Sequence, residues 1–192
     1  MHKRLIPLLL LLAACANTPA YSFKGGTLSP PAAAADIVVP DQNGQPFRLS
    51  EQVGKVVLLF FGYTHCPDVC PTTMSDYKAV KQQLGADANK VRFVMVTVDP
   101  ARDTPAIMSR YLGIFDPSFV GLSPTPEQLA TLTKAYNITY ELDAPDARGN
   151  YAVAHSAISY AIDRSGQLRV MYPFGMGASA MTEDVRYLLA NR

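Results

Sequence analysis

The sequence has little charge and few of the side chains that bind metals or form disulfides. Its formal net charge is +1, charged residues make up 17%, and there are three cysteines and three histidines among 192 residues. Lys and Arg are scattered rather than gathered into a stripe, which argues against a nucleic-acid-binding protein. A hydrophobic fraction of 48% is too high for a disordered chain. The length allows one ordinary domain with a short appendage.

The apolar run near the N-terminus, at residues 5–12, is too short to cross a membrane as a helix. It follows two basic residues and fits the hydrophobic part of a secretory signal. It ends in Leu12-Ala13-Ala14-Cys15, which resembles a bacterial lipobox. We therefore expect residues 1–14 to be a signal peptide. Cys15 would be acylated and would anchor an extracytoplasmic lipoprotein, on the periplasmic side or outer face of the cytoplasmic membrane. The alternative is an ordinary signal peptide with an incidental cysteine.

Assigning Cys15 to lipid leaves one pair of cysteines, Cys66 and Cys70. A single pair excludes a disulfide scaffold that would hold the fold together. The pair therefore needs a local explanation: a redox pair, a local disulfide or a metal site.

The pattern of apolar residues and turn residues predicts one α/β domain over 36–192. Residues 15–35, rich in proline, glycine and alanine, are predicted to be the lipidated cysteine and a flexible tether. Strands are expected at 37–39, 46–49, 56–61, 91–98, 119–122, 158–163 and 168–172, and helices at 71–84, 105–112, 126–136 and 183–189. This order is that of a thioredoxin-like fold, a mixed central sheet flanked by helices, with an extra N-terminal hairpin.

The two cysteines lie where a buried strand is expected to end and a helix to begin. Open α/β sheets place their sites at such strand ends. A cysteine at the start of a helix is expected to favour the thiolate, the form that binds metal. Three residues separate Cys66 from Cys70, whereas a thioredoxin-type pair has two. Positions i and i+4 lie on one face of a helix, so both sulfurs could point at one ion.

A third donor is needed to complete such a site. Two thiolates and one imidazole suit copper, and the same donors could hold zinc. His2 leaves with the signal peptide. His65 adjoins Cys66, and the side chains of neighbouring residues rarely point the same way on a regular element. His155 is therefore our candidate for the third ligand. A redox pair or a structural disulfide remains the alternative, and neither would need His155.

Three motifs together resemble the Sco/SenC family, the copper chaperones for cytochrome c oxidase assembly. They are Phe60–Pro71 (FFGYTHCPDVCP), Val98–Pro105 (VDPARDTP) and Val153–Ser156 (VAHS), and the resemblance extends from Asp36 to Ala190. The resemblance implies a thioredoxin fold in which the motif cysteines and the distal histidine bind Cu(I) or Cu(II). By position these are Cys66, Cys70 and His155. It also implies that Asp68 and the turn at 99–104 lie near the site. The family often has a transmembrane anchor, which a lipobox replaces here.

The function implied is that of a metallochaperone delivering copper to the binuclear copper centre of cytochrome c oxidase. Its partners would be the copper-receiving subunit of a haem-copper oxidase, another copper chaperone, a thiol reductant and, through the lipid, a membrane. The alternative is a thiol–disulfide oxidoreductase that reduces the cysteines of that subunit, with Cys66 and Cys70 as its catalytic pair. A peroxidase of the same fold is a weaker option, because no arginine can be placed beside a peroxidatic cysteine.

Overall fold

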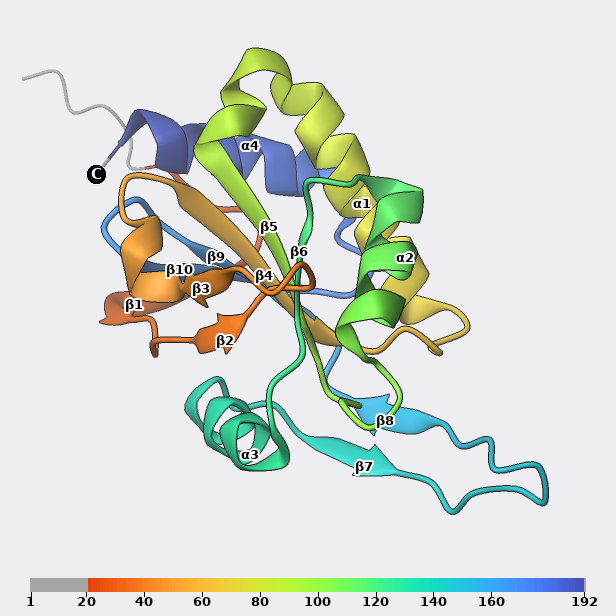
Figure 1. The fold of residues 1–192 in the computed structure, drawn as a ribbon. Helices are drawn as coiled ribbons and strands as arrows, with labels where there is room; N and C mark the ends of the chain where they lie inside the picture. Colours follow the sequence, from red (N-terminus) through yellow and green to blue (C-terminus); the bar gives the residue numbers. More distant parts are fainter. Residues whose placement is uncertain (1–20, 192) are drawn as a thin grey trace, which may run out of the picture.

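The computed structural model describes residues 21–191, so the predicted signal peptide and the acylation of Cys15 lie outside the described residues. Ten strands and four α-helices follow one another (Figure 1). The strands are β1 (Gly26–Ala33), β2 (Val38–Pro40), β3 (Pro46–Arg48), β4 (Val56–Gly62), β5 (Val91–Thr97), β6 (Val120–Leu122), β7 (Tyr140–Leu142), β8 (Val153–His155), β9 (Ile158–Ile162) and β10 (Gln167–Pro173). The helices are α1 (Val69–Leu84), α2 (Pro105–Phe115), α3 (Pro126–Ala135) and α4 (Gly177–Ala190).

A six-stranded mixed sheet, in the order β1-β10-β9-β4-β5-β6, forms the centre of the molecule. Strands β4, β5 and β6 are parallel, whereas β9, β10 and β1 are added antiparallel. Every residue of β4 is buried, as its unbroken apolar sequence predicts. Helix α1 packs against α2 and α4, while α3 lies apart from them, between the β2–β3 hairpin and β7 (Figure 1). The predicted α/β architecture is confirmed.

The N-terminal hairpin predicted from the sequence is present as β2 and β3, which pair antiparallel. Its turn contains Gly44, whose φ of 74° is the left-handed conformation that favours glycine. The side chain of Gln42 joins the hairpin to the sheet, since its amide accepts from the backbone N–H of Gly121 at 2.7 Å and donates to the carbonyl of Phe119 at 2.8 Å.

Part of the segment predicted to be a flexible tether is ordered. Residues 26–33 form β1, which pairs with β10 and extends the sheet. Ahead of it, the buried carboxylate of Asp184 accepts a hydrogen bond from the Tyr21 hydroxyl at 2.8 Å and from the backbone N–H groups of Lys24 and Gly25. The ring of Tyr21 stacks on Tyr187 at 4.0 Å. A chain that starts at Tyr21 therefore keeps every element described.

Two further elements differ from the prediction. The segment between α3 and His155, for which no strand was predicted, contains the two-stranded sheet of β7 and β8. Helix α4 begins at Gly177, six residues before the predicted start at Glu183. Thr182, the residue just before that predicted start, lies inside the helix, and its hydroxyl donates to the carbonyl of Ala178 at 2.8 Å.

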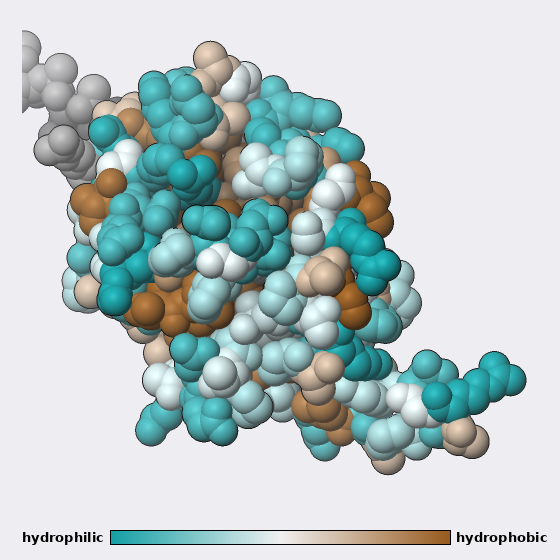
Figure 2. All heavy atoms as spheres, in the orientation of Figure 1, coloured by the Kyte–Doolittle hydropathy of each residue, from teal (hydrophilic) through white to brown (hydrophobic). Residues whose placement is uncertain are grey.

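The face drawn in Figure 2 is mostly hydrophilic, with hydrophobic residues in separate patches. Five large apolar side chains are exposed: Val38, Val53, Ile114, Leu142 and Phe174. Among the described residues, no helix combines the length and the apolar composition that a membrane crossing requires.

Candidate metal centre

The structure brings together the three residues predicted to bind a metal. The sulfurs of Cys66 and Cys70 and a ring nitrogen of His155 all lie within 4.8 Å of one another. Both cysteines are free thiols. Cys66 comes from the connection between β4 and α1, Cys70 is in the first turn of α1, and the histidine is the last residue of β8. The ligand set proposed from sequence is therefore assembled in space.

The two sulfurs meet across the turn that precedes α1 rather than along a helix face. The helix begins at Val69, so Cys66 lies outside it and Cys70 is its second residue. The backbone N–H of Cys70 donates to the Cys66 sulfur at 3.4 Å, which holds the turn closed. The predicted closeness of the sulfurs is confirmed, although the geometry that produces it is different.

Gly62, the last residue of β4, makes room for the Cys70 sulfur. A Cβ at this position would lie 2.4 Å from the ring of Phe60 and 3.0 Å from that sulfur. Both distances are shorter than ordinary van der Waals contacts, so a larger residue at this position would displace the Phe60 ring or the Cys70 sulfur. This role was not predicted from the sequence, in which Gly62 simply follows the strand expected at 56–61. A glycine four residues before the first cysteine was the available signal.

His155 presents its Nε2 atom to the cysteines. Nε2 lies 3.5 Å from the Cys70 sulfur, and Nδ1 lies 3.1 Å from the carbonyl oxygen of Ser156. A carbonyl only accepts hydrogen bonds, so Nδ1 carries the ring proton and the lone pair of Nε2 faces the sulfur. Burial lowers the pKa of His155 below its ordinary value, although the bond to Ser156 opposes this. The imidazole is therefore neutral at pH 7, as a metal ligand must be.

Cys70 departs from the protonation state expected at the start of a helix. Burial, followed by its proximity to Cys66 and Asp103, raises the pKa of the Cys70 thiol far above its ordinary value. Its side chain is completely buried, and desolvation of a thiolate outweighs the favourable helix dipole there. The expectation of a thiolate is therefore wrong for the metal-free protein. A metal ion would have to displace the Cys70 proton on binding.

The spacing of the donors fits a small soft metal ion. Metal–sulfur bonds of about 2.3 Å and metal–nitrogen bonds of about 2.0 Å place donors in a trigonal site about 3.5–4 Å apart. The Cys70–His155 distance of 3.5 Å already has this value, and the limit of 4.8 Å for the whole set requires only small shifts. Cys66 and His155 are partly exposed, so an ion could reach the donors from solvent.

The turn at 99–104 contacts both chain segments that carry ligands. The buried carboxylate of Asp103 accepts from the backbone N–H and hydroxyl of Thr64 at 2.9 and 2.5 Å, and from the Thr97 hydroxyl at 2.5 Å. Thr64 lies two residues before Cys66. The buried carboxylate of Asp99 accepts from Arg102 and from the Tyr151 hydroxyl, on the segment that leads to His155.

The two other polar residues singled out near the cysteines lie on the surface. Asp68 is the N-cap residue of α1, and its exposed carboxylate makes no capping hydrogen bond. The ring of His65 is half exposed, with Nδ1 3.6 Å from Asp103, and it does not belong to the ligand cluster.

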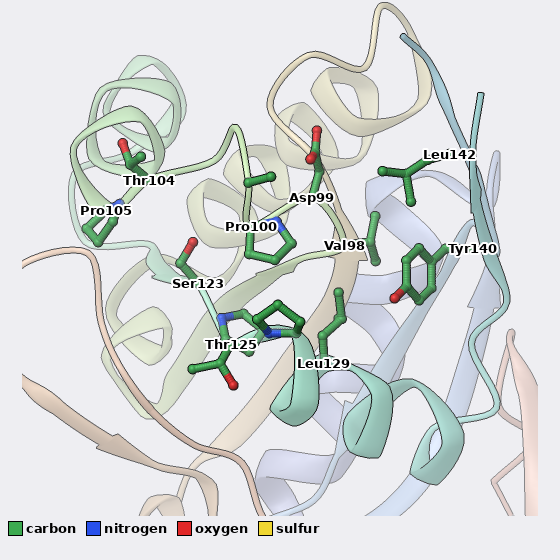
Figure 3. Close-up of a pocket in the computed structure, with 13 residues that line it drawn as sticks. Val98, Asp99, Pro100, Thr104, Pro105, Ser123, Thr125, Leu129, Tyr140 and Leu142 are labelled. Carbon is green, nitrogen blue, oxygen red and sulfur yellow. The ribbon is translucent and has the colours of Figure 1, made fainter. Parts of the chain in front are cut away.

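A pocket of about 540 Å³ lies beside β7 but does not contain the three ligands (Figure 3). Tyr140 and Leu142 lie on one side of it, close to Val98 and across from Leu129 (Figure 3). His155 instead borders a smaller hollow of about 330 Å³, together with residues of β7 and β8. The ligand geometry, rather than the size of a cavity, identifies the metal centre.

Comparisons with known proteins agree with this site and fold. The family model described as SCO1/SenC matches residues 27–190. The copper-bound structure of Bradyrhizobium japonicum ScoI has 37% identity and a TM-score of 0.75, over 82% of this chain and 100% of that one. The apo Sco1 protein of Thermus thermophilus has 34% identity and a TM-score of 0.78, over 90% of this chain and 100% of that one. The thioredoxin-like fold is thereby confirmed.

A protein of Stutzerimonas stutzeri is 40% identical over 130 residues, which are 67% of this chain and 63% of the relative. The chain thus spans less than two thirds of that relative's length.

Proposed function

The chain belongs to the SCO1/SenC family, and from that premise we propose that it binds one copper ion and delivers it to the binuclear copper centre of cytochrome c oxidase. The observation that carries this proposal is the convergence of Cys66, Cys70 and His155 within 4.8 Å. Two sulfurs and one imidazole are soft donors, which favour copper over harder divalent ions. The B. japonicum relative, similar in fold, was solved with copper bound.

The unequal exposure of the ligands suggests how copper would enter and leave. Cys70 is buried, whereas Cys66 and His155 are partly exposed. On binding, Cys70 would lose its proton as its sulfur coordinates copper. His155 would coordinate without losing a proton from Nε2, because its ring is already neutral. A donor of the recipient would approach from the exposed side and replace Cys66 or His155 first. Three donors leave room for such an incoming ligand, because copper accepts a fourth.

The partners follow from the same chemistry. The recipient would be the copper-receiving subunit of a haem-copper oxidase, and another copper chaperone would load the site. A thiol reductant would be required, since oxidation of Cys66 and Cys70 to a disulfide removes both sulfur ligands. We further propose that acylated Cys15 anchors the protein on the extracytoplasmic side of a membrane. Asp68, exposed between the cysteines, would face the recipient.

Anaerobic copper titration of the chain beginning at Tyr21 tests the ligand set. We expect one equivalent to bind, with sulfur-to-copper charge-transfer bands for Cu(II). Cys66→Ala, Cys70→Ala and His155→Ala should each abolish stoichiometric binding. His65→Ala is the matched control, because it removes the neighbouring histidine without touching the cluster, and it should bind like the wild type. Native copper affinity and spectrum in His155→Ala would show that the ligand assignment is wrong.

One observation favours a second role, that of a thiol–disulfide oxidoreductase. The two thiols are free and adjacent, with the Cys70 N–H already bonded to the Cys66 sulfur. Such a role requires both cysteines but not His155. Disulfide reduction by His155→Ala at the wild-type rate, together with no copper binding by the wild type, would favour this alternative.

A further inference from the structure

The hairpin that carries His155 is attached to the rest of the molecule at Tyr151. The guanidinium of Arg102 stacks on the Tyr151 ring, 3.4 Å from its centroid, and its Nη1 donates to the Tyr151 carbonyl at 2.8 Å. The Tyr151 hydroxyl donates to Asp99 at 2.8 Å, and Asp99 also accepts from Nε of Arg102. Ring, hydroxyl and carbonyl of one tyrosine are thus all held by a single turn.

This attachment matters because the hairpin is not part of the central sheet. Strands β7 and β8 form a separate two-stranded sheet that projects from the body of the molecule (Figure 1). The residues between them, 143–150, are all exposed. Closer to His155, a second hydrogen bond holds the hairpin. The backbone N–H of Val153 donates to the hydroxyl of Tyr63 at 3.3 Å, and Tyr63 lies three residues before Cys66.

The same turn also holds the cysteines. Through Asp103 it is bonded to Thr64, two residues before Cys66, and through Arg102 it is bonded to Tyr151, four residues before His155. We propose that Arg102 and Tyr151 are positioning residues that fix His155 at its distance from the two sulfurs. This inference rests on the proposed copper site. It concerns His155 alone, because the cysteine side of the turn is held by Asp103 and Thr64 rather than by Arg102 and Tyr151.

Groups that orient a metal ligand without touching the metal typically change metal affinity by about 10- to 100-fold when removed. Tyr151→Ala removes the ring and the hydroxyl but leaves the Arg102–Asp99 ion pair intact, so the buried carboxylate stays paired. We expect about 10-fold or greater acceleration of Cu(I) removal by a soluble chelator. Tyr151→Phe keeps the ring beneath the guanidinium and loses only the bond to Asp99, so its effect should be smaller.

A merely structural role would not produce the two remaining expected signals. In the metal-free Tyr151→Ala protein, the backbone amide of Val153 should exchange its hydrogen faster. In the Cu(II) form, electron paramagnetic resonance measures the hyperfine coupling between the imidazole nitrogen and the unpaired electron of copper. This coupling should weaken or become heterogeneous in Tyr151→Ala. The matched control is Tyr187→Ala, which removes a tyrosine stacked on Tyr21 at the other end of the chain. It should leave both signals and the release rate unchanged.

The outcomes separate this inference from the proposed function. If His155→Ala retains native copper affinity, the copper site itself is wrong. If His155→Ala loses copper while Tyr151→Ala releases it at the wild-type rate, with unchanged exchange at Val153, the site stands and the positioning role is refuted. An equal effect of Tyr187→Ala would also refute it, because the change would then reflect general destabilisation.

Discussion

At the scale of single residues, one contact in the candidate metal centre joins two groups, Cys70 and His155, that are both neutral before the metal arrives. Burial raises the pKa of the Cys70 thiol and lowers that of the His155 imidazole. The thiol hydrogen can then bond to Nε2, which lies 3.5 Å away and has no proton of its own. The metal-free site is thus an uncharged hydrogen-bonded pair, which is inexpensive to bury.

Gly62→Ala tests how closely the residues around this pair are packed. The new methyl group would lie 2.4 Å from the Phe60 ring and 3.0 Å from the Cys70 sulfur, so one of them must move. We expect a loss of about 1–3 kcal/mol in the free energy of unfolding, together with weaker copper binding. Chemical denaturation and copper titration measure the two effects.

Gly113→Ala, in helix α2, is the matched control. Its Cβ meets no atom within 4 Å, so it should be neutral or slightly stabilising. Unchanged stability and affinity in Gly62→Ala would mean that the glycine is not required for the site.

At the scale of elements, the β9–β10 turn is organised around the carboxylate of Asp163. This carboxylate accepts from the backbone N–H groups of Ser165 and Gln167, from the Ser165 hydroxyl and from Arg169. Burial alone would raise the pKa of Asp163, but these hydrogen bonds lower it below its ordinary value of 3.8. The ionised form is therefore the one that stabilises the fold.

Because the pKa is lower in the folded than in the unfolded chain, this stabilisation is present above about pH 4 and is lost as the pH falls through the folded value. Asp163→Asn should lower the free energy of unfolding by about 1–3 kcal/mol at pH 7, since an amide replaces a charged acceptor. The difference from the wild type should shrink below about pH 4. Denaturation measured between pH 3 and pH 7 checks this, and a difference independent of pH would contradict it.

The sequence was sufficient for the elements that build the centre of the fold. The continuous apolar runs of β4 and β5 predict buried strands, and the capping box of Thr125 and Gln128 predicts the start of α3, where both of its hydrogen bonds are present. The three proposed ligands also stand out in the sequence, because cysteines and histidines are rare in this chain.

The elements that were missed depend on contacts far apart in the sequence. Strand β1 contains Pro30 and Pro31, which disfavour a strand unless it lies at a sheet edge, and its register shifts along β10. Its position depends on β10 and on Asp184, about 140–160 residues away, and no local pattern reveals such contacts. The β7–β8 hairpin is short and mostly exposed, so it lacks the alternating apolar residues that indicate a half-buried strand.

At the scale of the whole molecule, the proposed copper ligands join parts of the chain that are 85 residues apart in the sequence. A ligand that binds only the folded state stabilises it by about 2.7 kcal/mol at a free concentration 100 times its dissociation constant. For a domain of this size we expect Cu(I) to raise the midpoint of thermal unfolding by about 5–10 °C under those conditions. Calorimetry of the reduced protein with and without Cu(I) measures the shift. The shift should disappear in His155→Ala and persist in His65→Ala, and equal shifts in both variants would contradict the site.

The fastening of residues 21–33 to β10 and to Asp184 limits how far the domain could stand from a bilayer. Under the proposed acylation of Cys15, only residues 16–20 separate the lipid from Tyr21, whose contacts hold it to α4. Even fully extended, that stretch spans about 20 Å, roughly the diameter of a small domain or less. The attachment point at Tyr21 would then stay within about 20 Å of the lipid surface. Any greater height of the proposed copper ligands above the membrane would have to come from the dimensions of the domain itself.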